Sequence, residues 1–228
     1  MNMSIKQWVR IGILFTVSIG ILSAQGQIDF REQTNIRAEH RFTQDFSVAV
    51  MAAAILTNDI QEVGFAYFDG GLGYKITPNL GVNANYRQLF RRNLYNAYDK
   101  RHVFYADLDY AKGLPGPWTF AGTLRLQGQF FNHVFSEGPR PPTFYARTRV
   151  GLRYKINYFW QPFVESELFT PLFRPNRPLP DQIRMSLGMS YTFNRYLRLE
   201  VYEQMQRQIN AASDNIFFLT AINWGLRF

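Results

Sequence analysis

The stretch Ile216–Phe228 reads I-F-F-L-T-A-I-N-W-G-L-R-F and alternates as a β-strand with one apolar face does. Every second position contributes to this face: Ile216, Phe218, Thr220, Ile222, Trp224, Leu226 and Phe228. Asn223, Gly225 and Arg227 occupy the other parity, so the two faces of the strand differ in polarity. A strand of this kind that ends on an aromatic residue favours a membrane β-barrel over a soluble domain.

Residues 1–24 have the features of a cleaved export signal. Lys6 and Arg10 give a positive start, an apolar run follows over Ile11–Ile21, and the small residues Ser23 and Ala24 precede Gln25. An N-terminal membrane anchor is the alternative, but the apolar run is shorter than the ~20 residues that span a bilayer. We therefore expect two parts, a signal peptide over 1–24 and an outer-membrane β-barrel over 25–228.

The absence of cysteine excludes several kinds of protein. With Cys 0, the chain has no disulfide framework, no thiol nucleophile and no cysteine-based metal site, and it carries no lipid-modified cysteine after the signal. No metal spacing or dinucleotide-binding fingerprint stands out either, because Gly70-Gly71-x-Gly73 lies in a predicted strand with no helix after it. We expect no cofactor.

The charge of the chain is basic without a basic cluster. Lys+Arg 25 exceed Asp+Glu 17, for a formal net charge of +8. The basic residues recur at alternate positions of predicted strands instead of gathering in a tail or on a helix, so nucleic acid is not an expected partner.

Period-two alternation runs through nearly the whole chain after the signal. Strand-like segments lie near 28–42, 46–56, 63–76, 80–91, 101–111, 118–131, 143–155, 158–169, 182–193, 197–207 and 215–228. Most have about the length of a tilted membrane strand, ~9–11 residues, or slightly more. Because bacterial single-chain barrels have even strand numbers, we predict an all-β fold, a single antiparallel transmembrane β-barrel of 10 or 12 strands. The first segment, 28–42, is then the one whose status as a full strand is in doubt.

Aromatic residues distinguish a membrane barrel from a soluble β-sandwich, which would also alternate. The apolar faces end in Phe42, Tyr74, Tyr110, Trp118, Tyr154, Trp160, Tyr191 and Trp224. Tyr and Trp at strand ends match the interfacial girdles of membrane barrels.

The connections alternate in length, which predicts the orientation of the barrel. Short ones are expected at Thr43–Asp45, Thr77–Asn79, Lys112–Pro117, Ile156–Tyr158 and Asn194–Tyr196. Longer ones are expected at Thr57–Glu62, Arg92–Lys100, Asn132–Pro142, Thr170–Asp181 and Gln208–Asp214. Short turns of such barrels face the periplasm, so the proline-rich loops Gly138–Pro142 and Pro171–Pro180 would lie on the cell surface. A parity shift at Asp69–Gly71 predicts a β-bulge there.

The polar parity of a membrane barrel points into its lumen, which predicts a charge cluster inside. Its members are Arg87, Arg101, Asp107, Asp109, Arg147, Arg149, Arg153, Glu165 and Glu167. A three-residue turn at Ile156–Tyr158 would place Arg149 opposite Glu165 and Arg147 opposite Glu167. The turn at Thr77–Asn79 would likewise place Asp69 opposite Arg87.

Several functions fit such a lumen. Paired charges can fill a narrow barrel, so we expect a structural or solute-related protein with an arginine-rich, largely filled lumen. The alternatives are a narrow anion-preferring channel, a surface-binding protein that uses its proline-rich loops, and a lipid-active enzyme. Among His40, His102 and His133, only His102 is a candidate for catalysis, and no serine is near it in sequence. We expect no enzymatic activity; the expected partners are outer-membrane lipid, small anionic solutes and surface partners.

The sequence also resembles a family of outer-membrane barrels, domain of unknown function family 2490. The resemblance rests on Tyr86-Arg87, on Arg101-His102 followed by Asp107 and Asp109, and on the order of the later motifs. Those motifs are Arg147-x-Arg149, Arg153-Tyr154-Lys155 and Pro162-x-x-Glu165-x-Glu167-Leu168-Phe169. The resemblance spans roughly Phe30 to Phe228 and implies an exported barrel in a Gram-negative outer membrane, with no known activity.

Overall fold

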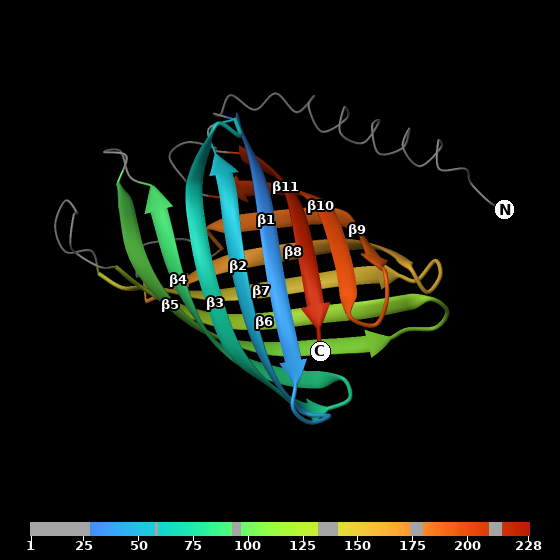
Figure 1. Cartoon of the computed structure of the whole chain (residues 1–228). Coiled ribbons are helices and arrows are strands. Elements are labelled where there is room, and N and C mark those ends of the chain that lie inside the picture. The colour runs from blue at the N-terminus through green and yellow to red at the C-terminus, as the bar shows by residue number, and fades with distance from the viewer. Residues whose placement is uncertain (1–27, 58, 93–96, 132–140, 174–179, 210–215) are drawn as a thin grey trace.

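A single closed β-sheet makes up the structure (Figure 1). The computed structural model describes residues 28–57, 59–92, 97–131, 141–173, 180–209 and 216–228. The predicted signal peptide, 1–24, lies outside the described residues, as does most of both proline-rich loops. No helix in the described ranges is long and apolar enough to cross a membrane.

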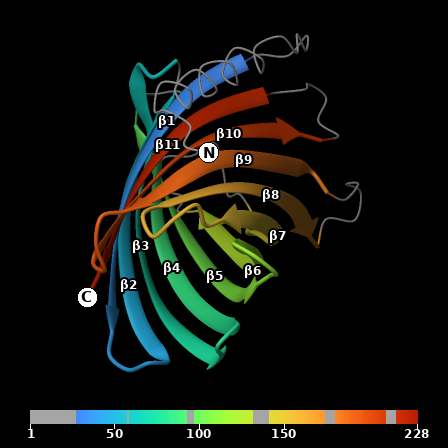
Figure 2. The same ribbon diagram turned by 90° about the vertical axis from the view of Figure 1, so that its right-hand side faces the viewer.

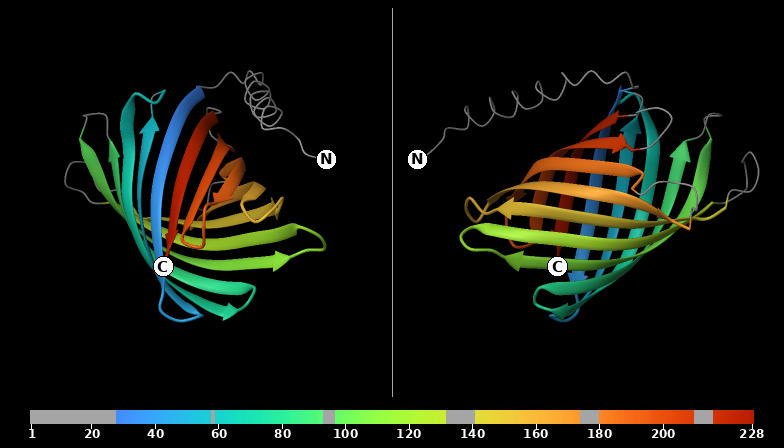
Figure 3. Two further views of the ribbon diagram at one scale, coloured as in Figure 1. Left: turned by 45° about the vertical axis from the view of Figure 1, so that its right-hand side comes forward. Right: turned by 180° about the vertical axis from the view of Figure 1, so that it is seen from behind.

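Eleven strands form the barrel within the described residues. They are β1 (Ile28–Arg41), β2 (Phe46–Thr57), β3 (Glu62–Thr77), β4 (Leu80–Arg92), β5 (Tyr98–Gly113), β6 (Trp118–Phe131), β7 (Thr143–Tyr154), β8 (Trp160–Leu172), β9 (Gln182–Thr192), β10 (Leu197–Gln208) and β11 (Ile216–Arg227). Seen from behind, the green to orange strands cross the blue ones at a steep angle (Figure 3), as expected for strands that tilt around a closed barrel.

The first strand closes the barrel, which corrects the predicted strand number. β1 is a full strand and pairs with β11 in parallel, from Ile28↔Ile216 to Glu39↔Arg227. Figure 2 shows the two strands side by side. Backbone bonds extend the pairing: Phe228 N donates to Glu39 O (2.9 Å) and Arg41 N to Phe228 O (3.1 Å). The prediction of 10 or 12 strands was therefore wrong, because an odd number closes when one neighbouring pair runs parallel.

Strand alternation separates an outer face from an interior. On β4, Leu80, Val82, Ala84 and Tyr86 point outward, and the polar residues between them point inward, as predicted. The inward direction is fixed by contacts between strands that are not neighbours. Tyr105 Oη on β5 donates to Asp69 on β3 at 2.5 Å, and Arg153 on β7 donates to Glu200 on β10 at 3.0 Å.

The five short turns gather at one end of the barrel, together with Phe228, and we name this the short-turn end (Figure 1). In four of them a Thr or Asn side chain accepts a bond from the backbone N–H three residues later. The bonds are Phe46 N to Thr43 (2.9 Å), Leu80 N to Thr77 (3.1 Å), Trp160 N to Asn157 (2.8 Å) and Leu197 N to Asn194 (2.9 Å). Side chains of this type compete for backbone donors and so favour tight turns.

Two local predictions need correction. The turn expected at Ile156–Tyr158 is longer, because Ile156 N donates to Trp160 O and the ladder pairs Arg153 with Phe163. The β7–β8 register is therefore shifted by two residues from the expected one. The bulge expected at Asp69–Gly71 is absent there: pairing is continuous through these residues, and the β2–β3 register shifts between Ile55 and Leu56 instead.

Aromatic rings form a row on the outer face at the short-turn end. Trp118 contacts Tyr154 with ring centroids 4.8 Å apart, and Trp160 contacts Tyr191 at 4.5 Å. Further along, Phe193 stacks on Trp224 at 6.4 Å. The row follows from strand parity, since each aromatic lies near the end of a strand on its outward parity.

Candidate functional site: the charged interior

All nine residues of the predicted charge cluster lie on the inward parity of their strands. Arg87 comes from β4; Arg101, Asp107 and Asp109 from β5; Arg147, Arg149 and Arg153 from β7; Glu165 and Glu167 from β8. The structure does not bring them into one cluster. It distributes them over several ion-pair groups around the wall, and the guanidinium of Arg101 lies 4.9 Å from the Phe131 ring.

The first group joins β3, β4 and β5 around Asp69. This carboxylate is 7% exposed and accepts bonds from Arg87 Nε (2.9 Å) and Nη2 (2.7 Å) as well as from Tyr105 Oη. Arg87 also lies over the Tyr67 ring at 4.1 Å. Asp69 and Arg87 are direct ladder partners, as predicted. Three donors and an aromatic face together stabilise a buried ion pair that would otherwise be costly.

The second group is centred on β5 and β6. Arg125 binds both oxygens of Asp107, at 2.6 and 2.8 Å, and lies over the Tyr105 ring at 3.9 Å. Asp109 has neutral donors instead, Asn83 Nδ2 and Thr123 Oγ1, both at 2.6 Å. A planar guanidinium held by two carboxylate oxygens has one orientation, so this side chain is fixed against the wall.

A third group spans β7 to β9. Arg147 donates to both oxygens of Glu167 at 2.9 and 3.0 Å, and Arg184 approaches Glu167 at 3.5 Å. Both guanidinium groups lie against the Phe169 ring, at 4.3 and 4.4 Å. One glutamate therefore serves two arginines, and the aromatic ring between them offers each a further favourable contact.

A fourth group lies nearer the short-turn end. Arg153 binds Glu165 at 2.9 Å and Glu200 at 3.0 Å, and Arg198 binds Glu200 at 2.8 Å. The pairs predicted from the short turn form as ion pairs, but along diagonals. In the ladder Arg149 faces Glu167 and Gly151 faces Glu165; arginine is long enough to reach a diagonal neighbour.

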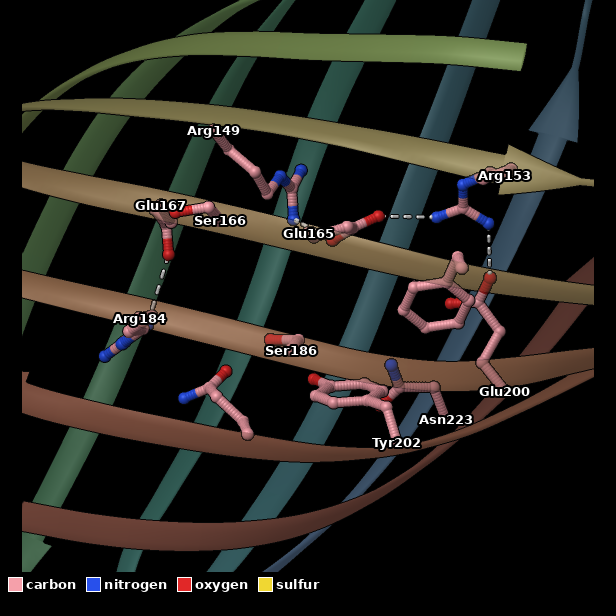
Figure 4. A pocket seen from close by; sticks show the side chains of 12 residues that line it. Arg149, Arg153, Glu165, Ser166, Glu167, Arg184, Ser186, Glu200, Tyr202 and Asn223 are labelled. Carbon is pink, nitrogen blue, oxygen red and sulfur yellow. Dashed lines mark hydrogen bonds and ion pairs between the residues drawn. The ribbon is translucent and has the colours of Figure 1, made fainter. Parts of the chain in front are cut away.

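Arg149 is the exception in this interior. Its closest carboxylate, Glu165, is 3.9 Å away, its bond to Thr123 is long at 3.4 Å, and 45% of its side chain is exposed. It lines a cavity of about 100 Å³ together with Arg184, Ser186, Tyr202 and other residues of β7 to β11. Figure 4 shows these side chains projecting into the space between the strands. Three arginines and three glutamates line this cavity, and Arg149 is the arginine with the longest ion pair.

A larger hollow of about 360 Å³ lies at the short-turn end. Arg37, Arg41 and Lys75 line it together with the acids Glu39, Asp45 and Asp109. Glu39 is 3.8 Å from Arg37 and 3.1 Å from Arg41. Basic and acidic side chains therefore line this hollow in equal number.

Several functional candidates were missed by sequence reasoning. Arg184, Arg198, Tyr67 and Tyr105 hold central positions in the four groups. A signal for Arg184 was present, since Gln182, Arg184, Ser186 and Ser190 share one parity of their segment. No such signal marked the tyrosines, because an aromatic residue on the polar parity resembles a packing residue.

His40 and His102, the two histidines within the described residues, take no part in the four ion-pair groups. His102 points outward and its Nδ1 lies 2.7 Å from Tyr86 Oη, and His40 packs edge-on against Phe42 at 4.6 Å. His133 lies outside the described residues. In the described ranges, no group of three or more His, Asp and Glu side chains is placed to hold a metal ion.

These features define a class: a closed all-β barrel with an apolar, aromatic-bordered outer face and an ion-paired interior. The chain belongs to the family described as "Protein of unknown function (DUF2490)", whose sequence profile matches residues 21–216. This confirms the resemblance noted from its motifs.

Three solved structures are similar to this chain at low sequence identity. The β domain of the Bordetella autotransporter BrkA has a TM-score of 0.48 and 10% identity, and covers 78% of this chain and 82% of that chain. The NanC porin has a TM-score of 0.48 and 11% identity, over 78% and 86%. The anion-selective porin from Comamonas acidovorans has a TM-score of 0.40 and 11% identity, over 79% and 52%. No curated protein matches the sequence.

Proposed function

We propose that this chain is an integral outer-membrane β-barrel of a Gram-negative bacterium that gives small anions a narrow passage. The observation that carries the proposal is Arg149: a half-exposed guanidinium whose ion pair with Glu165 is long, at 3.9 Å, and which faces a cavity inside a closed barrel. Charged groups that line a pore select the ions that pass.

The outer face supports the membrane location. Large apolar side chains stand exposed all around it, among them Phe68, Leu72, Phe104 and Leu126. Exposed apolar surface of this extent marks contact with a membrane or a partner. The aromatic row at the short-turn end fits an interface girdle, and short turns belong on the periplasmic side of such barrels. The long connections would then face the exterior.

The interior supports a narrow passage over a wide pore. Most arginines of the four ion-pair groups are held against the wall by close carboxylates, which leaves little free volume. Arg37, Arg41 and Lys75 line the hollow at the short-turn end, where they balance Glu39, Asp45 and Asp109. Arg149, whose ion pair is the longest in the interior groups, is therefore the group that favours anions over cations.

We expect no lipid hydrolysis from this barrel. The hydrogen-bonding partner of His102 is the phenol of Tyr86, whereas hydrolases of this kind need a nucleophile beside the histidine.

Single-channel recording tests the passage. The purified protein in planar bilayers under a KCl gradient should give small, resolved conductance steps whose reversal potential indicates Cl⁻ preference. Replacing both Arg37→Gln and Arg41→Gln should reduce that preference, because the acids of the short-turn hollow would then exceed its bases. Arg195→Gln is the matched control, since Arg195 lies in a turn over the Tyr196 ring and lines neither hollow. Silent bilayers at high protein load, with a folded barrel, would leave a purely structural role.

A further inference from the structure

We propose that the cavity beside Arg149 is a binding site for one small monocarboxylate, occupied by the solute during its passage. The proposal rests on the passage proposed above and specifies its ligand. It is built from three observations: the long ion pair of Arg149, the groups that face the cavity, and the room inside it.

The charged waist is the set of ion-paired residues in the four groups, together with Asp109 and Arg149. Its arginines are Arg87, Arg125, Arg147, Arg149, Arg153, Arg184 and Arg198; its acids are Asp69, Asp107, Asp109, Glu165, Glu167 and Glu200. Around the cavity itself, Arg149, Arg153 and Arg184 face Glu165, Glu167 and Glu200, so the charges of the lining balance. Among these arginines Arg149 has the longest ion pair, so it is the one that a mobile anion can bind with the least disturbance.

Arg149 is the most weakly held arginine of the charged waist. Its distance to Glu165 is 3.9 Å, longer than any other ion pair of the waist, and Glu165 already has a closer partner in Arg153 at 2.9 Å. Arg149 can therefore bind a ligand without leaving Glu165 unpaired. The reorganisation that binding requires is small.

The groups around the cavity suit a carboxylate. Figure 4 places Arg149 on one side of the space and Ser186 on the other, with Tyr202 and Asn223 nearby. A guanidinium presents parallel N–H groups that match the two oxygens of a carboxylate. The Ser186 hydroxyl, the amide of Asn223 and the Tyr202 phenol add neutral hydrogen-bonding groups for the rest of the ligand. Phe163 supplies an apolar part of the wall.

Size and charge limit the ligand further. A water molecule takes about 30 Å³ in the liquid, so a cavity of about 100 Å³ has room for a few waters or for a molecule the size of acetate or lactate. Glu165, Glu167 and Glu200 also line the cavity. These carboxylates repel a second negative charge, so a monoanion is favoured over the phosphate dianion.

Acetate is the probe for the test, with phosphate for comparison. Calorimetric titration of the folded barrel in detergent should give saturable acetate binding and weaker phosphate binding. Acetate added to KCl should also reduce the chloride conductance in a saturable way. Arg149→Gln should weaken acetate binding by about tenfold to a hundredfold, the range for losing a charge-assisted bond. Arg149→Lys should weaken it less, because the charge remains while the planar fork is lost.

Arg195→Gln, which removes an arginine outside the interior, should bind acetate as the unchanged protein does. Acetate binding that does not saturate, or that persists in Arg149→Gln, would overturn the site even where chloride conductance is intact. Saturable acetate binding without any conductance would support the site and refute the passage, so the two proposals fail separately. Equal or tighter binding of phosphate would overturn the preference for a monoanion.

Discussion

Buried ion pairs in this barrel are positioned by more than charge. Asp69 accepts bonds from Arg87 and Tyr105, while Arg87 also rests on the Tyr67 ring. A lone carboxylate at 7% exposure would be strongly destabilised. Around Asp69, each partner removes part of that cost, so the wall tolerates this buried charge.

Asp69→Asn should destabilise the barrel by about 3 kcal/mol, because Arg87 is left buried without its counter-charge. Unfolding in denaturant, followed by tryptophan fluorescence in micelles, measures the change. Asp45→Asn, in an exposed turn, is the control and should have almost no effect. Adding Arg87→Gln to Asp69→Asn should recover much of the lost stability, since the buried guanidinium that has lost its counter-charge is removed. An Asp69→Asn protein as stable as the unchanged one would contradict this account of the pair.

At the scale of the element, strand parity decides whether a charged side chain faces the interior or the outer face of the barrel. On β10, Glu200 points inward and binds Arg153 and Arg198. Glu203, three residues later, has the opposite parity and points to the outer face. There it accepts a bond from Thr220 at 2.9 Å, among apolar neighbours such as Leu187 and Val201. A carboxylate on the lipid-facing side of a barrel is destabilising.

Replacing these two glutamates should therefore have opposite effects. Glu203→Leu should stabilise the folded barrel in lipid by about 1 kcal/mol, because the outward carboxylate is replaced by an apolar side chain. Glu200→Leu should destabilise it, since two interior arginines lose a partner. Equilibrium unfolding from lipid vesicles distinguishes the two. Destabilisation by Glu203→Leu would mean that this face contacts something other than lipid tails.

At the scale of the whole molecule, the parallel β1–β11 seam is the feature that makes an eleven-stranded barrel possible. Neighbouring strands are about 4.8 Å apart, so outward residues across the seam should be within reach of a short cross-linker. Ala38 and Leu226 are Cα partners there.

A chain carrying Ala38→Cys and Leu226→Cys should cross-link rapidly with a short dithiol-reactive reagent. No native cysteine interferes, since the chain has Cys 0. The product is detected as a species of altered gel mobility after full denaturation. A chain carrying Ala38→Cys and Leu124→Cys is the control and should not cross-link within one molecule, because β6 is far from β1 around the barrel. Failure of the first pair to react would argue against closure through this seam.

The sequence by itself determined the local features. Alternation located the strands, the inward arginines and the outer aromatic row, because side-chain direction in a strand repeats every two residues. Thr43, Thr77 and Asn194 marked the short turns, because their side chains bond to nearby backbone. The Asp69–Arg87 pair was predicted correctly, although the turn is one residue shorter than expected, because a register shift between Lys75 and Thr77 offsets the difference.

Only the tertiary structure decided the rest. The parallel pairing of β1 with β11 joins opposite ends of the chain, and no local pattern distinguishes it from an open edge or an even-numbered barrel. The β7–β8 register depended on a turn two residues longer than expected, which moved Arg149 opposite Glu167. Which arginine holds which acid, and which one remains available, depends on distances across a closed interior. Those distances are set by strand number and stagger together, and so they belong to the whole barrel and not to any one strand.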